Sequence, residues 1–231
     1  MKYKTLVKKL NIKEEDFSKI KDAISQAESK TTGEIAIAVT PESENYAFWE
    51  LLVADLFTFL VLLILLPFSS KILDAYRLIY WQHEPAHILP YFYIITSFAS
   101  LLIAFYLANI PAIDRLIIPS SVKKQCVTNR AMRYFTESGI YQTKTNSGIL
   151  IFVSYMERQV RIIADSGISS KISQDLWNLI ADELSEEIKK ENATNAFINA
   201  IEKCGILLKQ NFPSDEENSN EFPDGLVILG A

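Results

Sequence analysis

Two long runs of apolar residues stand out against the mixed apolar and polar pattern of the remaining chain. The run from Ile88 to Ile113 contains no charged side chain, and the run from Leu51 to Phe68 contains only Asp55. A helix rises about 1.5 Å per residue and needs about 20 apolar residues to cross a bilayer. The pattern predicts two transmembrane helices rather than buried core helices, since the stretch from Phe59 to Phe68 would need apolar cover on every side.

Two acidic residues, Glu50 and Asp55, lie near the start of the first predicted span. They could mark a polar site within the membrane. We expect them at the interface instead, because a helix N-terminus favours negative charge.

The predicted spans form an antiparallel hairpin, because only residues 69–87 connect them. Lysine and arginine are frequent before Asn45 and between Asp114 and Arg133, whereas the connection carries only Lys71 and Arg77. Cytoplasmic segments of membrane proteins carry the excess of these residues. Both termini are therefore predicted to be cytoplasmic, and the loop 69–87 is predicted to face outward.

On both sides of the hairpin, apolar residues recur at the spacings of strands and amphipathic helices, as in an α/β domain. Glu34 to Thr40 alternates in the manner of a half-buried strand, and Gly148 to Ser154 is a continuous apolar run typical of a central strand. Gln159 to Ala164 is predicted to form a hairpin with it. Helical spacing predicts helices from a cap at Asn11 to Ala27, from Ser120 or Ser121 to Phe135 with a stop near Gly139, from Ile172 to Ile188, and from Phe197 to Leu208.

This order predicts a small sheet with helices on its faces. One helix and one strand before the hairpin cannot bury enough apolar area by themselves. Residues 1–45 and 114–231 are therefore predicted to form one discontinuous domain, interrupted by an inserted hairpin, residues 46–113. The acidic segment 213–220 is predicted to be mobile.

Composition excludes some partners and compartments. The net charge is -5 and the lysines are interleaved with acids, so no basic stripe indicates nucleic-acid binding. Cys126 and Cys204 stand far apart without a CxxC motif, which favours small core residues in a reducing compartment. The Lys-rich start, Met1 to Leu10, has no apolar core behind it and predicts no cleavable secretory signal.

Histidine chemistry is confined to the predicted outward loop, where His83 and His87 are the only histidines of the chain. The predicted cytoplasmic domain therefore lacks a histidine for a serine or cysteine hydrolase mechanism. The segment 83–87 matches the H-E-x-x-H pattern of zinc proteases. Pro85 keeps His83 and His87 from sharing one helix, so we expect an interfacial loop instead of a zinc site.

Acids at the predicted strand ends remain as candidates for chemistry. Glu34, Glu157 and Asp165 could converge on a divalent cation, or they could be solvated strand ends, which is the commoner role.

Several of these segments resemble the TPM domain family: Thr32 to Val39, Asn146 to Ser154, Glu157 to Ile162 and Asp165 to Ile168. The hairpin inserted after the first strand, and the tail Asn220 to Asp224, are similar to bacterial membrane proteins of that family. The resemblance implies an α/β/α sandwich. It also implies varied roles, since some relatives are described as phosphatases or divalent-cation binders and others as assembly, repair or receptor-accessory factors at membranes.

The chain departs from the family where a site is expected. Ser147 replaces the usual acidic or amide residue between Asn146 and Gly148, and Asp165-Ser166-Gly167 replaces a Gly-aromatic-Gly turn. Both departures weaken the transfer of cation or phosphate chemistry to this chain.

Two function hypotheses follow from the resemblance. The first is a membrane-anchored accessory module of the bacterial inner (plasma) membrane, which binds a membrane-protein partner in assembly or maintenance and needs no cofactor or small-molecule substrate. The alternative is a divalent-cation-dependent phosphatase, in which Glu34, Asn146 and Asp165 hold a cation such as calcium.

Overall fold

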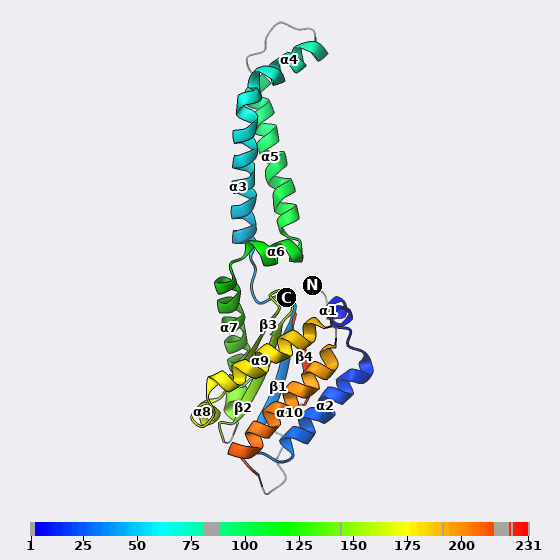
Figure 1. The fold of residues 1–231 in the computed structure, drawn as a ribbon, viewed down its shortest axis with the longest axis vertical. Helices are drawn as coiled ribbons and strands as arrows, with labels where there is room; N and C mark the ends of the chain where they lie inside the picture. The colour runs from blue at the N-terminus through cyan, green and yellow to red at the C-terminus, as the bar shows by residue number, and fades with distance from the viewer. Residues whose placement is uncertain are drawn as a thin grey trace. The chain divides into compact units, whose positions relative to one another are not determined.

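The chain divides into two units in space. A computed structural model describes residues 3–80, 88–143, 145–190, 192–214, 222 and 224–230. The sheet unit comprises Met1–Glu44 and Ser121–Ala231, and the hairpin unit comprises Asn45–Ser120. The chain therefore leaves the sheet unit once and later returns to it (Figure 1).

The strands of the described residues form one sheet in the order β3-β2-β1-β4. β1 (Glu34–Thr40) pairs in parallel with β2 (Gly148–Ser154), and β2 pairs antiparallel with β3 (Gln159–Ala164). The register places Glu34 opposite Gly148 and Ile37 opposite Ile151. These strands match the ranges that the sequence predicts.

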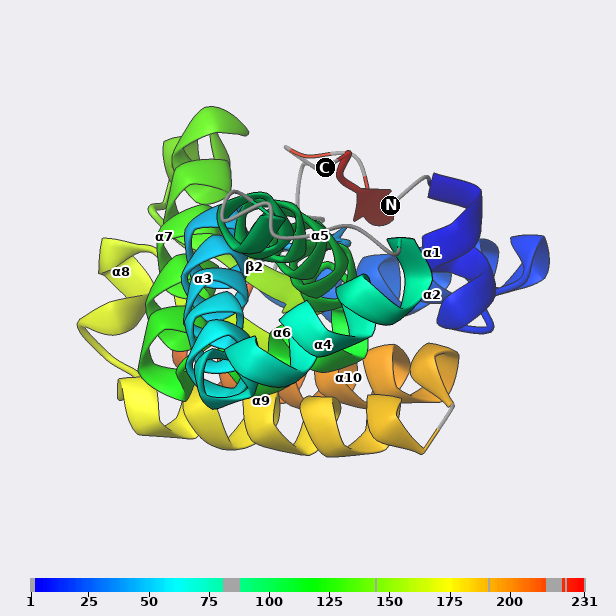
Figure 2. The same cartoon turned by 90° about the horizontal axis from the view of Figure 1, so that it is seen from above.

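One face of the sheet is covered by α2 (Glu14–Glu28), α9 (Gln174–Lys189) and α10 (Ala193–Asn211). α10 lies between the other two helices and packs against both (Figures 1 and 2). The apolar side chains that face these helices alternate along each strand, as a sheet with one covered face requires. The buried cluster includes Ile35, Ile37, Val39, Ile149, Ile151 and Val153 of the sheet and Ile20, Ile24, Trp177, Phe197 and Ile201 of the helices.

The opposite face of the sheet packs against α7 (Ser120–Glu137). Leu150 and Phe152 of β2 are buried against Ala131 and Phe135 of this helix. Gly139 follows with a φ of 76°, which glycine adopts without a steric penalty and which ends the helix. The sheet unit is therefore an α/β/α sandwich, as predicted.

The hairpin unit is built on α3 (Ala47–Leu65) and α5 (Ile88–Ala108), which pack side by side in opposite directions. Small and hydroxylated residues occupy their contact, because Ala54, Thr58 and Ser100 are buried. Ser100 Oγ donates a hydrogen bond to Thr58 Oγ1 at 3.4 Å. Small residues of this kind let two helices approach closely.

The large side chains of α3 and α5 mostly point away from this contact. Phe59 is 66% exposed and Phe98 is 64% exposed. Two helical segments are long and apolar enough to cross a membrane. One is α5, and the other is α3 together with its continuation to Leu78. They are far less buried than core helices, since only 11% of the apolar segment that begins with α3 and 6% of that in α5 is buried.

The ends of the predicted spans differ from the prediction. α5 ends at Ala108 instead of Ile113, because Pro111 begins a separate helix, α6 (Pro111–Ile117). After α3 come a short 3-10 turn, η1 (Leu66–Phe68), and an amphipathic helix, α4 (Ser69–Tyr80), where a loop is expected from the sequence. The rest of that loop, 81–87, lies outside the described residues, as do residues 215–220 of the acidic segment.

The first predicted helix also has a different start. Asn11 has a φ of 54° and is no cap, and α2 begins at Glu14. The backbone N–H of Lys13 donates instead to Asp16 Oδ2 at 2.9 Å. Elements outside the prediction include a short helix, α1 (Tyr3–Lys9), which buries Leu6, and β4 (Leu226–Ile228), which pairs in parallel with β1.

Candidate functional site

The candidate residues predicted from the sequence gather around Gly148, the first residue of β2. Glu34 is 2% exposed, and its backbone N–H donates to the carbonyl of Ser147 at 3.1 Å. The backbone N–H of Asp165, directly after β3, donates to the carbonyl of Gly148 at 2.9 Å. Asn146 precedes Gly148 by two residues and has a left-handed φ of 49°. Parallel and antiparallel pairing thus bring the three residues to one end of the strands, the edge of the sheet at which β1 and β2 begin and β3 ends.

The loop before β2 is fixed by hydroxyl groups. Ser147 N–H donates to Thr143 Oγ1 at 2.8 Å, and Ser147 Oγ donates to the carbonyl of Thr32 at 2.7 Å. Thr145 Oγ1 also forms a hydrogen bond with Ser147 Oγ. Ser147, where the family usually has an acid or amide, therefore ties the loop to the start of β1.

Close backbone contacts hold this loop against the neighbouring turn. A Cβ on Gly167 would lie 2.5 Å from the carbonyl oxygen of Asn146, and a Cβ on Gly148 would lie 2.2 Å from that of Ile140. Both distances are too short for a side chain, so only glycine allows the approach.

The two carboxylate oxygens of Asp165 have different surroundings. Oδ1 accepts hydrogen bonds from the backbone N–H of Ser166 at 2.5 Å and from its hydroxyl at 3.2 Å. Asp165 thereby caps the short helix α8 (Ser166–Ser169). Oδ2 is buried and receives no hydrogen bond from the described part of the chain. The main role of this carboxylate in the fold is to cap a turn.

A third carboxyl group, not predicted as a site residue, lies at the same edge. Glu28 at the end of α2 accepts a hydrogen bond from the backbone N–H of Ile35 through Oε1, at 2.6 Å. Burial, together with the nearby charges of Glu34 and Asp224, raises the pKa of Glu28 to about 9 against the lowering effect of that hydrogen bond. Glu28 is therefore protonated at neutral pH. Glu28 follows Ile20 and Ile24 at successive intervals of four residues, which is a sequence signal for the buried face of the helix.

The acids at this edge do not form a ready cation site. Within the described residues no group of three or more His, Cys, Asp or Glu side chains is arranged to hold a metal ion. A buried, protonated Glu28 is also a poor cation ligand. Bound calcium needs six or more oxygens at about 2.3 to 2.6 Å, so the side chains would have to move.

Glu157, the remaining acid predicted at a strand end, lies at the opposite end of the sheet from Glu34 and Asp165. Its Oε1 accepts a hydrogen bond from the backbone of Ser43 at 2.8 Å, and its Oε2 accepts one from Ser154 Oγ at 2.5 Å. Glu157 stabilises the turn between β2 and β3, and it does not converge with the other two acids.

The remaining candidates from the sequence have no part in this edge. His83 and His87 lie outside the described residues. Cys126 and Cys204 are both free thiols, and burial on α10 raises the pKa of Cys204 to about 12. A buried thiol of this kind is a poor nucleophile.

Comparisons with known proteins agree with the resemblance noted from the sequence. Residues 112–206 match the family model of the TPM domain. The solution structure of the BA42 protein from the psychrophilic bacterium Bizionia argentinensis is similar, with a TM-score of 0.54 and 19% sequence identity over 94% of each chain. No curated protein matches the sequence. At this identity the structural likeness establishes the fold and not an activity.

Proposed function

We propose that this chain, in which residues 112–206 match the family model of the TPM domain, is an accessory module anchored in the bacterial inner membrane. The hairpin unit spans the bilayer, and the sheet unit binds a membrane-protein partner during assembly or maintenance. This role needs no catalytic group and no resident cofactor.

The outward apolar surface of α3 and α5 is the observation that carries the proposal. Leu56, Phe59 and Leu63 on α3, and Ile95 and Leu102 on α5, are each more than half exposed. Removing one such side chain from water stabilises a protein by about 1.5 to 3 kcal/mol. A surface of many such residues therefore needs an apolar environment, and a bilayer supplies it along the length of both helices.

The distribution of basic residues supports cytoplasmic termini. Arg115, Lys123 and Lys124 follow the second apolar helix, and the N-terminal flank is Lys-rich, whereas the connection between the spans has few cations. Such asymmetry orients membrane proteins with the basic side in the cytoplasm.

Membrane integration is tested by alkaline extraction of membranes from cells that produce the full chain. We expect the wild type to stay in the membrane pellet and a Leu56→Lys, Phe59→Lys, Leu63→Lys variant to integrate poorly, because each charge at a helix centre costs about 3 kcal/mol in a bilayer. Leu179→Lys, a change at an exposed residue of α9, is the matched control and should remain integrated. A wild type that is soluble and monodisperse without detergent would contradict the anchor.

Topology is tested with reporters. A reporter fused after Ala231 should behave as cytoplasmic, and one placed between Gln82 and His87 as external. The reverse result would overturn the proposed orientation.

The accessory role is tested against the phosphatase alternative with the purified protein. We expect no cation-dependent hydrolysis of p-nitrophenyl phosphate with Ca²⁺ or Mg²⁺. Hydrolysis by the wild type that Asp165→Asn abolishes, with the fold retained, would replace the accessory role by an enzymatic one.

A further inference from the structure

A cavity of about 160 Å³ lies in the sheet unit, away from the edge around Gly148. It is enclosed by the end of α1, the turn between β2 and β3, and α9. Buried aliphatic side chains form part of its wall: Leu10, Val153 and Val160. One water occupies about 30 Å³ of liquid, so the cavity has room for a ligand the size of roughly five waters.

Three cationic side chains from three separate elements also line the cavity. They are Lys9 on α1, Arg158 in the turn after β2, and Lys189 on α9, and all three residues are exposed. Lys9 Nζ lies 5.6 Å from the centre of the Tyr155 ring, which is also part of the wall. The cavity thus combines an aliphatic interior with a positively charged opening.

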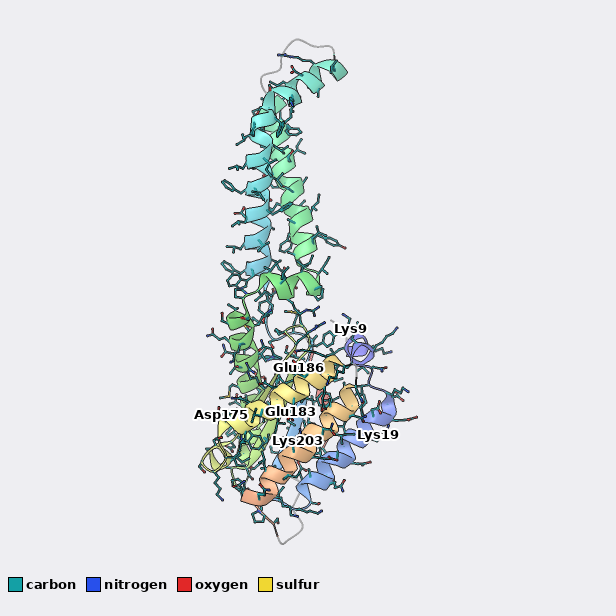
Figure 3. All side chains as sticks on the ribbon, in the orientation of Figure 1. Lys9, Lys19, Asp175, Glu183, Glu186 and Lys203 are labelled. Carbon is teal, nitrogen blue, oxygen red and sulfur yellow. The ribbon has the colours of Figure 1, made fainter. Side chains whose placement is uncertain are left out.

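Negative charge is scarce at this opening. The described residues that line the cavity include no carboxylate. Glu186 on α9 (Figure 3) pairs with Lys189 at 2.5 Å and offsets the charge of that lysine. Both oxygens of Glu157 accept hydrogen bonds from Ser43 and Ser154. None of the ion pairs found in the described part of the chain includes Lys9 or Arg158, and their charge is available to a ligand.

The backbone holds Arg158 in an uncommon conformation. Its φ of 52° is left-handed, which costs a non-glycine residue about 1 kcal/mol or more. Its N–H donates to the carbonyl of Tyr155 at 3.3 Å, and its carbonyl accepts from Ser185 Oγ at 3.3 Å. The turn that carries Arg158 is also hydrogen-bonded to the end of β1, since Tyr155 N–H donates to the carbonyl of Thr40 at 3.0 Å. The cation at the opening is therefore attached to a well-supported turn.

We propose that this cavity binds a small organic anion that joins a carboxylate to a short aliphatic group. Lys9 and Arg158 bind the anionic group, and Leu10, Val153 and Val160 contact the aliphatic group. The ligand is either a free short-chain acid or the last residue of a partner chain, whose terminal carboxylate and aliphatic side chain present the same chemistry. The site is independent of the proposed membrane role, because it lies wholly within the sheet unit.

The test uses the full chain in detergent micelles, labelled on Leu, Val and Ile methyl groups and observed by NMR. Isovalerate should bind and shift methyl signals of Leu10, Val153 and Val160. Isoamylamine, which has a similar aliphatic body but a positive charge, should bind at least tenfold more weakly. Equal binding of the two probes, or shifts without any change at these methyl groups, would overturn the proposal.

Variants separate the site from general charge attraction. Arg158→Gln should weaken isovalerate binding at least fivefold with unchanged methyl signals elsewhere. Lys21→Gln, an exposed residue of α2 outside the cavity, is the matched control and should leave binding unchanged. Equal weakening of isovalerate binding by both variants would mean that only the net charge of the protein matters, and the proposed site would be refuted.

Two peptides distinguish the sources. N-acetyl-Ala-Ala-Val with a free carboxylate is compared with its C-terminal amide and with isovalerate. Tighter binding of the free-carboxylate peptide than of isovalerate assigns the site to a partner's chain end, whereas tighter or equal binding of isovalerate assigns it to a free acid. Binding of the amide as tight as that of the free carboxylate would overturn recognition of the anion.

Discussion

The Glu28 carboxyl group accepts a hydrogen bond from the backbone N–H of Ile35 at 2.6 Å and so joins the end of α2 to the start of β1. Burial is the main cause of its raised pKa, and two acids add to it: Glu34 at the beginning of β1 and Asp224 in the segment before β4. Elements distant in sequence thus meet at one buried, protonated acid.

Glu28 should make the stability of the sheet unit depend on pH. Its folded pKa of about 9 lies above the ordinary value of 4.5, so the folded state binds a proton that the unfolded state releases. The free energy of unfolding should therefore fall as pH rises from about 4.5 to about 9, by up to about 1.4 kcal/mol per pH unit. Urea unfolding of the detergent-solubilised protein across this range measures the slope.

Glu28→Gln should remove most of this slope and stabilise the protein at pH 8 to 9, because the amide oxygen can still accept from Ile35 and carries no charge. Glu202→Gln, at an exposed position of α10, should leave the slope unchanged. A wild type whose stability does not depend on pH in this window would refute the protonated state of Glu28.

Asp16 should stabilise the start of α2. It accepts from the backbone of Lys13 and from Lys19 Nζ, both at 2.9 Å, and these hydrogen bonds, the backbone one first, lower its pKa. Asp16→Ala should lower the free energy of unfolding by about 1 kcal/mol at pH 7. The stabilisation should disappear as pH falls below the ordinary pKa of 3.8, because protonation of the folded state removes it.

Thermal unfolding of Asp16→Ala beside Asp22→Ala measures the capping effect, since Asp22 is exposed in the middle of the same helix. Equal losses in the two variants would show that Asp16 has no capping role.

Gly148→Ala should destabilise the sheet unit. The new Cβ would lie 2.2 Å from the carbonyl oxygen of Ile140, in the 3-10 turn η2 (Ile140–Gln142), and backbone atoms cannot rotate away as a side chain can. A loss of about 1 to 3 kcal/mol is expected, together with faster amide exchange in β2. Gly230→Ala, with no atom within 4 Å of the new Cβ, should behave as the wild type.

The sheet unit should fold without the hairpin unit but not without β1. Replacing Asn45–Ser120 with a flexible linker costs roughly a few kcal/mol of loop entropy and leaves the sheet complete. Deleting Met1–Glu44 exposes the apolar edge of β2 and should cause aggregation. Amide hydrogen exchange of Gly148 to Ser154 is compared between the linker variant and the deletion variant. Equal protection from exchange in the two would mean that the two flanks fold independently.

The sequence predicted elements whose periodicity is long and internally consistent. β2 is a run of seven buried residues, and α9 and α10 each bury one stripe, so the local pattern already reflects the final packing. β4 has no such pattern. Its three residues become a strand only because β1 offers a free edge, and that edge depends on tertiary structure.

The candidate site was only partly predictable for the same reason. Glu34, Asn146 and Asp165 flank predicted strands, so their common edge follows from strand pairing. Glu28 and Asp224 reach that edge through α2 and β4, and neither is near a strand end in the predicted order of elements. Arg158 and Lys9 meet at a cavity for which no single segment carries a signal.

The insertion of the hairpin unit between β1 and β2 has a consequence for protein synthesis. About a hundred residues separate Thr40 from Gly148, and ribosomes add roughly 5 to 20 residues per second. β1 therefore emerges about 5 to 20 seconds before its central partner exists, with both strand edges unpaired. During that interval Ile35, Ile37 and Val39 have no β2 to pack beside, and the sandwich closes only after the hairpin unit has been made.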